Sequence, residues 1–541
     1  MHRTFPDLAT PLMHVFLWTE GDPRPVIARP EKGCGDCWHT DDASLTIVRH
    51  ENSDRFSIDI TATKPVRQAI LRWSHAWAPG TRMMGDAWER SYGELEWRGF
   101  TPHRTLPWYL VANDGSSSAG YGVQTGAASI ACWQADGGGL TLSLDLRSGG
   151  AGVVLESRVL RAATVVQRPP VEGESAFAAT RGLCAGLCPG QSTPPRPIVG
   201  HNDWYWLYGK NSEELILEAT RRFMSLYPKN TDVVPWSVID DGWQTPAGHD
   251  LHVNGGPWIN RNPGFPDMPG LACRIKELGA RPGIWVRPLN TKGVVPASWE
   301  SRKPRRPSKG GTCLDPSLPE VLDLVRRDIA RLREWGFEMI KYDFTTFDVT
   351  GLWGVAIGHP MGFAPDGWTL ADNRKTTAEV LVNLYQNIRD AAGPDVLLIG
   401  CNTVGHLIAG LAEIQRIGDD TSATDWDRTR RMGVNTLAFR APQQGTLFAA
   451  DADCVPVSPH VSPKLTRQWL DLVARSGTPL FLSMDPAACD ARMQDDIRRA
   501  LEAAVRTCAP AEPLDWFDSA IPSRWMLQGV ETRYDWNEWT D

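Results

Sequence analysis

The carboxylate and ammonium groups of residues 339–344 form the first candidate for nucleophilic chemistry. This run reads Met-Ile-Lys-Tyr-Asp-Phe, and a strand here would place Lys341 and Asp343 on the same side because strand side chains alternate. A neighbouring ammonium group favours the ionised form of a carboxylate, which is the form that a nucleophile needs. An ordinary ion pair at a strand end would explain the same two residues.

A second acidic cluster, Asp419 and Asp420, follows the apolar run 413–418 and lies just after Arg416. Glycoside hydrolysis needs two carboxyl groups, one on each side of the bond that is cleaved. Repulsion between neighbouring acids raises the pKa of one of them, so we expect a protonated donor near neutral pH in this cluster.

Asp240 and Asp241 form a third acidic pair after an apolar run. Because adjacent acids are costly to bury together, they suggest a ligand whose several hydroxyl groups donate hydrogen bonds to them. A metal site is the competing explanation, but Lys341 and Arg416 would oppose a bound cation. The histidines form neither His-x-His nor His-Glu-x-x-His, which disfavours a metallohydrolase. Glycoside hydrolysis needs only a carboxylate and a proton donor, so we expect no metal and no organic cofactor.

The elements that would position these acids alternate along residues 196–510. Apolar runs and helix-periodic segments follow one another, which predicts a (β/α)₈ barrel with the acids on the face built by the loops after the strands. The predicted strands are 198–206, 233–240, 282–288, 338–343, 395–401, 413–418, 445–450 and 478–482. The predicted helices are 212–226, 266–278, 317–335, 372–391, 405–410, 426–438, 463–475 and 490–505.

Two further regions flank the predicted barrel. Residues 1–190 contain short alternating runs, such as 56–60 and 140–144, separated by turn residues, and predict an antiparallel β-sandwich domain. The proline-rich segment 188–197 predicts an extended linker. Residues 511–541 are too few for a second sandwich and predict a short C-terminal β extension that packs on the barrel.

The composition narrows the class of protein. A formal net charge of −8 and a pI near 5.9 argue against a nucleic-acid partner or an anionic membrane surface. The sequence has neither a membrane-spanning apolar stretch nor a signal peptide, so we expect a cytoplasmic protein. The 24 tryptophans suit the flat apolar faces of sugars, and we expect a carbohydrate partner. The sequence does not determine the oligomeric state.

The 11 cysteines are odd in number and scattered, which predicts reduced, buried thiols rather than a disulfide framework. A zinc site built from Cys34, Cys37, Cys184 and Cys188 is an alternative that the spacing only weakly supports.

Taken together, the motifs resemble glycoside hydrolase families 27 and 36, the clan of α-galactosidases and α-N-acetylgalactosaminidases. The resemblance covers about 195–510 and implies a (β/α)₈ barrel. The predicted N-terminal sandwich makes the chain more similar to family 36 than to family 27. In two respects the chain departs from the pattern: the N-terminal domain of family 36 is larger, and the usual C-terminal β-domain is longer than the tail of this chain. Residues 200–204 (Gly-His-Asn-Asp-Trp) resemble the first-strand motif, which implies that Trp204 contacts the sugar.

The next two motifs lie on the second and third predicted strands. Residues 240–243 (Asp-Asp-Gly-Trp) resemble the acidic pair that grips the galactose 4- and 6-hydroxyls, which implies that Asp240 and Asp241 bind substrate. Residues 283–285 (Gly-Ile-Trp) resemble the third strand, which implies that Trp285 lines the pocket.

The catalytic positions come from the fourth and sixth strands. Residues 341–343 match the nucleophile strand, which implies that Asp343 is the nucleophile and that Lys341 contacts the substrate. Arg416 matches an arginine that reaches the sugar near its 2-hydroxyl. The acid/base follows that arginine in the clan, which implies Asp420, with Asp419 as the alternative.

Two weaker matches complete the pocket. Residues 451–453 (Asp-Ala-Asp) resemble an Asp-Pro-Asp motif after the seventh strand, which implies that Asp453 lines the pocket. The end of the fifth strand, 400–403, lacks the family 27 signature that separates galactose from N-acetylgalactosamine. We place Cys401 there as a substrate contact and leave recognition at the 2-position open.

The function implied by the resemblance is a retaining glycosidase that cleaves terminal α-galactosides by double displacement, with carboxyl groups about 5–5.5 Å apart. The alternatives are an α-N-acetylgalactosaminidase, a β-L-arabinopyranosidase, an α-glucosidase, a transglycosidase or a non-catalytic sugar-binding protein. Candidates for both carboxylates count against the last of these, because binding requires neither.

Two other segments could complete the site. Residues 85–92 are dense in charges and aromatic groups, and they would either reach over the barrel mouth to the sugar or form an interdomain salt-bridge cluster. The loop 351–370 contains Trp353, Phe363 and Trp368, and we expect it on the leaving-group side.

Overall fold

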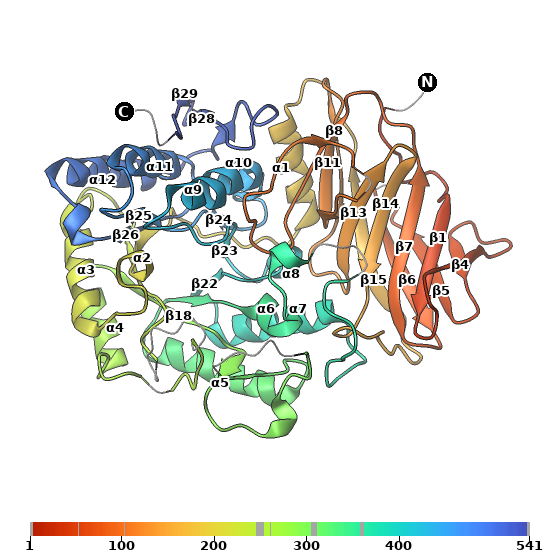
Figure 1. Ribbon diagram of the computed structural model, residues 1–541, viewed down its shortest axis with the longest axis horizontal. Coiled ribbons are helices and arrows are strands. Elements are labelled where there is room, and N and C mark those ends of the chain that lie inside the picture. Colours follow the sequence, from red (N-terminus) through yellow and green to blue (C-terminus); the bar gives the residue numbers. More distant parts are fainter. Residues whose placement is uncertain are drawn as a thin grey trace.

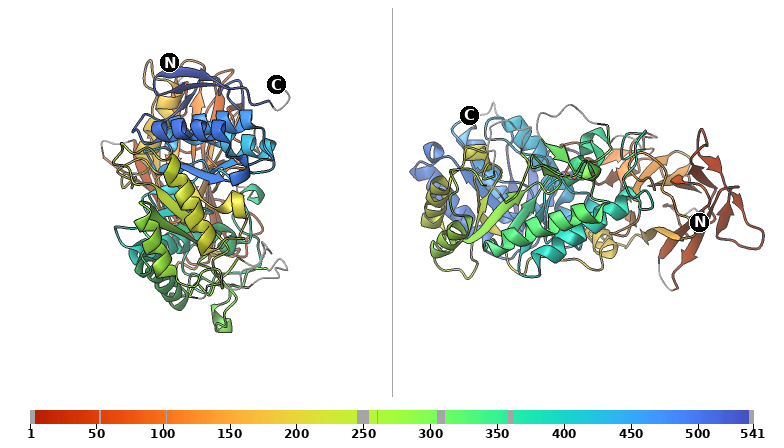
Figure 2. Two further views of the ribbon diagram at one scale, coloured as in Figure 1. Left: turned by 90° about the vertical axis from the view of Figure 1, so that its left-hand side faces the viewer. Right: turned by 90° about the horizontal axis from the view of Figure 1, so that it is seen from below.

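The computed structural model describes residues 4–51, 54–101, 103–244, 254–259, 261–304, 311–357 and 362–537. Antiparallel sheets occupy one end of the elongated molecule, and a curled parallel sheet flanked by helices occupies the other (Figures 1 and 2). A small C-terminal sheet lies near the last helices, at the top of Figure 1.

The parallel sheet has nine strands in the spatial order β24-β23-β22-β21-β18-β17-β16-β26-β25. Each of the eight predicted strands overlaps one of them, so the predicted series of parallel strands is confirmed. Their bounds are β16 (Val199–Asn202), β17 (Trp236–Ile239), β18 (Arg281–Val286), β21 (Met339–Tyr342), β22 (Leu397–Gly400), β23 (Ile414–Arg416), β24 (Ala449–Asp451), β25 (Val455–Val457) and β26 (Leu480–Met484).

The two edges of this sheet lie close together along the chain. β24 pairs with β23 and β25 pairs with β26, yet only residues 452–454 separate β24 from β25. Asp453, in the middle of this link, has φ 77°, a left-handed conformation that an aspartate tolerates better than most residues. The sheet therefore curls until one short segment joins its two edges.

The helices follow the strands as predicted, and their N-termini have local caps. The Ser212 side chain accepts a hydrogen bond at the start of α3, and Thr376 and Glu379 form a capping box at the start of α7. The helix after β22 is short, as expected, and the helix after β23 contains a π-helical turn. The bounds are α3 (Glu213–Leu226), α4 (Met268–Glu277), α5 (Pro319–Glu334), α7 (Thr377–Ala392), α8 (Gly405–Ile408), α9 (Trp426–Thr429), η3 (Arg430–Asn435), α10 (Thr436–Arg440), α11 (Pro463–Arg475) and α12 (Ala491–Ala504).

Shorter elements complete the region around the parallel sheet. They are α2 (Trp204–Leu207), β19 (Asn290–Thr291), η1 (Ala297–Trp299), β20 (Thr312–Cys313), α6 (Thr345–Thr350), η2 (Gly354–Ala356), η4 (Ala441–Gln443) and η5 (Pro486–Ala488).

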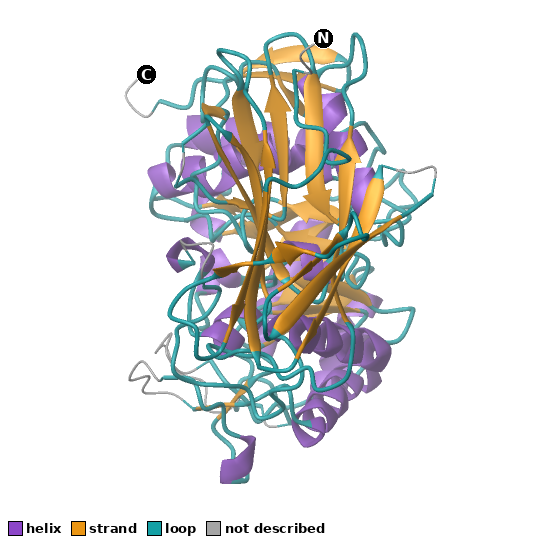
Figure 3. Cartoon of the chain, turned by 90° about the vertical axis from the view of Figure 1, so that its right-hand side faces the viewer, coloured by secondary structure: helices purple, strands orange, loops and turns teal. Residues whose placement is uncertain are grey.

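The antiparallel strands predicted in the N-terminal part are present in two sheets, which lie towards the viewer in Figure 3. Leu71 and Trp73 of one sheet share a buried core with Ile58 and Ile60 of the other. The first sheet contains β1 (His14–Thr19), β2 (Val26–Ile27), β7 (Val66–Ser74), β10 (Leu106–Pro107), β13 (Ile130–Asp136) and β14 (Gly139–Asp145). The second contains β3 (Arg29–Pro30), β4 (Cys37–His39), β5 (Ala43–Arg49), β6 (Arg55–Ala62), β8 (Arg82–Gly85), β9 (Arg98–Gly99), β11 (Tyr109–Asn113), β12 (Ser118–Val123) and β15 (Leu160–Arg168).

Helix α1 (Ala176–Leu187) was not expected, because the whole N-terminal part was interpreted as strands. It packs on β12, where two glycines permit the close approach. A Cβ atom at Gly120 would lie 2.9 Å from Leu183, and one at Gly122 would lie 2.7 Å from Leu187. The small residues that weaken the helical pattern of this segment are thus matched by glycines in the strand beneath it.

The C-terminal residues form the short β extension that the sequence predicts, apart from 538–541, which lie outside the described residues. Its strands are β27 (Glu512–Pro513), β28 (Arg524–Leu527) and β29 (Val530–Arg533). Trp525 is fully buried, and the Trp426 Nε1–H donates to the Trp536 carbonyl at 2.9 Å. The extension is therefore packed against the helices of the parallel sheet.

The cysteines differ from the expectation in one place. Cys34 and Cys37 form a disulfide, so the prediction of uniformly reduced thiols is wrong for this pair. Cys184 and Cys188 are free and buried, which excludes the four-cysteine zinc site because two of its ligands are consumed in the disulfide. Among the described helices, none is both long and apolar enough to span a membrane.

Candidate active site

A cavity of about 750 Å³ opens where the parallel strands end at their carboxyl ends. It is lined by all the predicted site residues except Cys401, namely Trp204, Asp240, Asp241, Trp285, Lys341, Asp343, Arg416, Asp420 and Asp453. Residues far apart in the sequence therefore meet at one face of the sheet, as a barrel-type active face requires.

Cys401 does not line the cavity, so the structure gives no support to the prediction that it contacts substrate. Its strand ends at Gly400, its amide donates to the Tyr342 carbonyl at 2.9 Å, and its side chain is only 1% exposed. Burial, reinforced by the charge of Asp343, raises the pKa of the Cys401 thiol. The side chain thus lies within the sheet wall, behind the residues that face the cavity.

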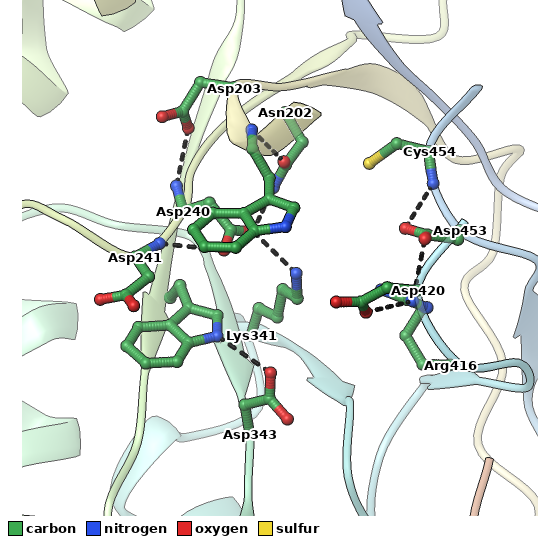
Figure 4. Close-up of polar contacts among 12 residues, drawn as sticks. Asn202, Asp203, Asp240, Asp241, Lys341, Asp343, Arg416, Asp420, Asp453 and Cys454 are labelled. Carbon is green, nitrogen blue, oxygen red and sulfur yellow. Dashed lines mark hydrogen bonds and ion pairs between the residues drawn. The ribbon is translucent and has the colours of Figure 1, made fainter. Parts of the chain in front are cut away.

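The cavity has two opposing walls, shown in Figure 4. The Asp343 wall comes from neighbouring strands β17, β18 and β21 and contains Asp240, Asp241, Trp285, Lys341 and Asp343. The Asp420 wall comes from β23, from the link between β24 and β25, and from the N-terminal segment, and contains Arg90, Arg416, Asp419, Asp420 and Asp453.

Lys341 forms its direct ion pair with Asp240 rather than with Asp343. The distance from Lys341 Nζ to Asp240 Oδ2 is 2.7 Å, and both side chains are buried. Although burial opposes the charged ammonium group, Asp240 holds the pKa of Lys341 above its usual value. Lys341 is therefore a fixed cation in the floor of the cavity.

Asp343 is oriented by two neutral donors. The Trp285 Nε1–H donates to Oδ2 at 3.2 Å, and the Phe344 amide donates to Oδ1 at 2.7 Å. The carboxylate is 8% exposed and faces the cavity. These contacts fix its orientation without neutralising it, which suits a nucleophile.

Phe344 adopts a strained backbone conformation directly after Asp343. Its φ of 63° lies in the left-handed region, which is costly for a bulky residue. The Phe344 ring lies 5.4 Å from that of Trp353, and the Arg287 guanidinium lies over the Phe344 ring, 4.2 Å from its centroid. The strain thus turns an aromatic ring into the cavity beside the proposed nucleophile.

Asp240 is held by hydrogen bonds from Asn202 and to Asp203, two residues of the motif 200–204 for which the sequence predicted no role. The Asn202 amide donates to Asp240 Oδ2 at 2.6 Å, and the Asp240 backbone amide donates to Asp203 Oδ1 at 2.7 Å. Burial and the nearby charge of Asp240 raise the pKa of Asp203 to about 7. The motif 200–204 therefore positions the second-strand acids, in addition to presenting Trp204.

Asp241 accepts a hydrogen bond from the Gln244 side chain. Burial raises the pKa of its carboxyl to about 6. In the same motif, Gly242 has φ 121° and Trp243 is fully buried with its indole donating to the Trp285 carbonyl at 2.9 Å. Asp240 and Asp241 thus face the cavity, whereas the last two residues of the motif serve packing.

Arg416 joins two of the three acids of the Asp420 wall, Asp420 and Asp453. Its Nη2 lies 3.0 Å from Asp420 Oδ1 and 2.9 Å from Asp453 Oδ2. Asp453 also accepts from the Tyr205 hydroxyl and, at 2.8 Å, from the Thr421 amide. Asp453 is therefore a fully bonded anchor for Arg416, and Asp420 is the partner with a free side towards the cavity.

Asp419 and Asp420 have different surroundings. The Asp419 carboxylate is bound by Arg90 at 3.2 Å and by Arg428 at 2.7 Å, whereas the Asp420 side chain is 42% exposed. Although burial acts to raise it, Arg416 and then Arg90 hold the pKa of Asp420 below its usual value. The predicted rise from mutual repulsion is wrong for Asp420, because arginines separate and compensate the two acids.

The segment 85–92 reaches the cavity and also forms an ion-pair cluster between the two parts of the chain. Arg90 and Tyr92 line the cavity, and Arg440 Nε lies 2.8 Å from Asp86 Oδ1 in a buried cluster between the two parts of the chain. The density of charges in the sequence indicated that this segment matters, but no sequence pattern indicated that Arg90 contacts Asp420, 330 positions away.

The loop 351–370 is divided. Trp353 lines the cavity, together with Phe347, on which its ring is stacked at 4.5 Å. Phe363 instead packs against Trp88, and Trp368 is buried in a separate small core, so neither lines the cavity. Residues 358–361 of the loop lie outside the described residues.

The donor set of the site does not resemble a metal centre. Within the described ranges there is no group of three or more His, Cys, Asp or Glu side chains arranged to hold an ion. The carboxylates of the cavity are paired with Lys341, Arg90 and Arg416 instead.

Comparisons with known proteins place this fold among α-galactosidases. No family model matches the sequence. A curated relative, α-galactosidase AgaA of Geobacillus stearothermophilus, is 30% identical over 148 residues, a quarter of this chain and 19% of that protein. The match thus spans about a fifth of the relative's length.

Solved structures match over most of the chain. TtGalA, an α-galactosidase from Thermus thermophilus in complex with p-nitrophenyl α-D-galactopyranoside, gives a TM-score of 0.60 at 17% identity, covering 91% of this chain and 97% of its own. The GH36 α-galactosidase AgaA from Geobacillus stearothermophilus gives 0.60 at 15% identity, with 95% and 77% covered. The chain therefore has a GH36 α-galactosidase-like fold.

Proposed function

We propose that this chain is a retaining glycoside hydrolase that removes terminal α-galactosyl groups. The observation that carries the proposal is the pair of carboxylates, Asp343 and Asp420, on opposite walls of one cavity at the carboxyl ends of the strands. The nine-stranded sheet serves as a (β/α)₈ barrel, formed by 196–510 between an N-terminal sandwich domain (1–190) and the C-terminal extension (511–541).

In the first step, an oxygen of Asp343 attacks the anomeric carbon while the bond to the leaving oxygen breaks. Asp420 donates its proton to that oxygen, so the leaving group departs neutral and a β-linked galactosyl-enzyme ester forms. In the second step, water attacks the same carbon, Asp420 accepts a proton from it, and the ester bond to Asp343 breaks. Two inversions release α-galactose.

The surroundings of Asp420 suit its second role directly. Arg416 and Arg90 stabilise the carboxylate, which is the form that accepts a proton from water. For the first step the carboxyl must carry a proton, so the lowered pKa of Asp420 predicts an acidic optimum for kcat/KM, which reports on the free enzyme.

Sugar recognition falls mainly to the remaining polar residues of the cavity. Asp240 and Asp241 can accept hydrogen bonds from neighbouring sugar hydroxyls, while Lys341 and Arg416 can donate them. Trp204 is half-buried and offers an apolar face. The side chains of the cavity thus supply hydrogen-bond donors, hydrogen-bond acceptors and an aromatic surface for a sugar, and the proposal requires no cofactor.

A panel of aryl α- and β-glycosides tests the proposal. We expect the purified chain to hydrolyse the α-galactoside and the Asp343→Asn chain, purified in parallel, to lack this activity. Preferential cleavage of an α-N-acetylgalactosaminide, a β-L-arabinopyranoside or an α-glucoside would replace the proposed sugar with that alternative. Silence across the panel would contradict catalysis and favour a sugar-binding protein.

A further inference from the structure

The N-terminal segment that carries Arg90 is joined to the loop after β23 by backbone hydrogen bonds. The Ser91 amide donates to the Ile417 carbonyl at 2.9 Å, and the Asp419 amide donates to the Ser91 carbonyl at 2.9 Å. Arg440 links these two segments, because its Nη1 donates to the Glu89 carbonyl at 2.8 Å and to the Ile417 carbonyl at 2.6 Å. The backbone on either side of Arg90 is therefore fixed against the strand end that presents Asp420.

Arg90 lies between the two neighbouring acids. Its Nη2 is 3.2 Å from Asp419 Oδ1, its Nη1 is 3.5 Å from Asp420 Oδ1, and its side chain is 6% exposed. The guanidinium also lies over the ring of Trp353 at 5.5 Å. Asp420 Oδ1 is thus close to one arginine from the end of β23, Arg416, and to one from the N-terminal part of the chain, Arg90.

We propose that Arg90 is a positioning residue for Asp420, and that Asp419 is the anchor of Arg90 rather than a second acid. The proposal rests on the proposed function, since it assigns the acid/base role to Asp420. Asp419 is bound on its other side by Arg428 at 2.7 Å, so it can hold Arg90 in place without turning towards the cavity. The N-terminal part of the chain would then contribute to the reaction through the guanidinium of Arg90.

The charge surroundings make the role measurable. The groups that face Asp420 are Arg416, Arg90, Lys341, Tyr205 and Tyr208. Those that face Arg90 are Asp419, Asp420, Glu89, Tyr92 and Cys401. Removal of Arg90 leaves Arg416 and Lys341 in place but removes one of the cations that favour the Asp420 carboxylate, so Asp420 should bind its proton more tightly.

The test compares the chains Arg90→Gln and Arg90→Lys with the native chain, using the pH dependence of kcat/KM on an α-galactoside with a poor leaving group. In Arg90→Gln the alkaline limb should move to higher pH by about one pH unit, because protonated Asp420 persists further. Arg90→Lys keeps the charge and should restore most of the native profile.

Arg428→Gln is the matched control, because it removes the other arginine of Asp419 without a contact to Asp420. Its alkaline limb should stay where the native one lies. An unchanged limb in a folded Arg90→Gln chain, or an equal shift in Arg428→Gln, would overturn the proposal. Thermal unfolding of each variant identifies a chain that has merely lost its fold. If Arg90→Gln does not fold, the pH profile of Arg90→Lys tests the proposal instead, since it should resemble the native profile.

A crystal structure of the Arg90→Gln chain separates this inference from the proposed function. We expect the Asp420 carboxylate to leave the position that it has beside Arg416, whereas an Asp420 unmoved within coordinate error would contradict the positioning role. If the native chain hydrolyses no glycoside of the panel, the proposed function fails, while the structure still reports on Arg90.

Discussion

The two walls of the cavity are built in different ways. In the Asp343 wall, Asp240, Trp285 and Asp343 come from adjacent parallel strands and bond to one another or to neighbouring backbone. In the Asp420 wall, the main contacts join Arg416 to Asp453 across a strand break and Asp420 to Arg90 across 330 positions of sequence.

The two walls also shift the pKa of a carboxyl group in opposite directions. Burial dominates at Asp241, whose pKa rises to about 6, whereas the arginines of the Asp420 wall outweigh burial and lower the pKa of Asp420. Burial therefore favours the protonated form of an acid in the Asp343 wall, whereas the arginines favour the carboxylate form of Asp420 in the other wall. The contrast predicts different consequences of equivalent substitutions.

The largest effect is expected at Asp343, because its removal leaves the Asp343 wall without a nucleophile. Asp343→Gly should lower kcat by at least about 1000-fold. Azide should restore part of the activity and give a β-galactosyl azide from an α-galactoside, because a single inversion replaces two. An α-configured azide product would place the nucleophile elsewhere.

Asp420→Gly should act selectively on the other wall. Loss of a general acid costs about 10²–10⁴-fold for a poor leaving group and much less for a good one such as nitrophenolate. Azide should intercept the galactosyl-enzyme and yield the α-configured product. Asp419→Gly, measured beside it, should give a smaller loss and no azide product; the reverse ranking would exchange the roles of the two acids.

A substitution in the Asp343 wall that spares the nucleophile should weaken binding and turnover together. For Asp241→Asn we expect a loss in kcat/KM of about 10- to 150-fold, from the roughly 1.5–3 kcal/mol of a charge-assisted hydrogen bond. Steady-state kinetics and thermal unfolding measure this. Unchanged kinetics in the folded variant would remove Asp241 from the sugar site.

The smallest effect concerns stability behind the Asp343 wall. The folded pKa of Asp203, about 7, exceeds its unfolded value, so the folded state binds the proton more tightly. This contribution to stability is fully present below about pH 4 and is lost as the pH rises towards 7. Asp203→Asn should flatten the decline in unfolding free energy between these values by about 1–3 kcal/mol.

Denaturant unfolding at several pH values measures this difference between the two chains. Other buried acids, such as Asp241 and Asp451, add to the slope of both and cancel in the comparison. An Asp203→Asn chain with the native slope would show that the proton is not bound at Asp203.

How far the sequence predicts the site depends on the wall. Period-two alternation and strand ends placed Asp343 and Asp241 correctly at the cavity, because each lies next to the apolar run that positions it. Alternation could not name the partner of Lys341, which is Asp240 two strands away. Nothing local to Asp420 indicates Arg90, since tertiary packing of the N-terminal segment alone brings them together.

The errors in the fold have similar causes. Cys401 is the last residue of the predicted strand 395–401, whereas the strand in the structure ends at Gly400 and the Cys401 side chain is buried. Helix α1 is rich in alanine and glycine, so its packing depends on Gly120 and Gly122 of a distant strand. In both cases the deciding contact is long-range in sequence.

The stereochemistry of hydrolysis tests the central claim most directly, because both walls must act on one anomeric carbon for configuration to be retained. Proton NMR of the native chain with an aryl α-galactoside records the first galactose anomer released, before mutarotation. The account predicts α-galactose first, with the β anomer appearing later and slowly. Initial release of β-galactose would show that water attacks directly, and would contradict the assignment of Asp343 as nucleophile.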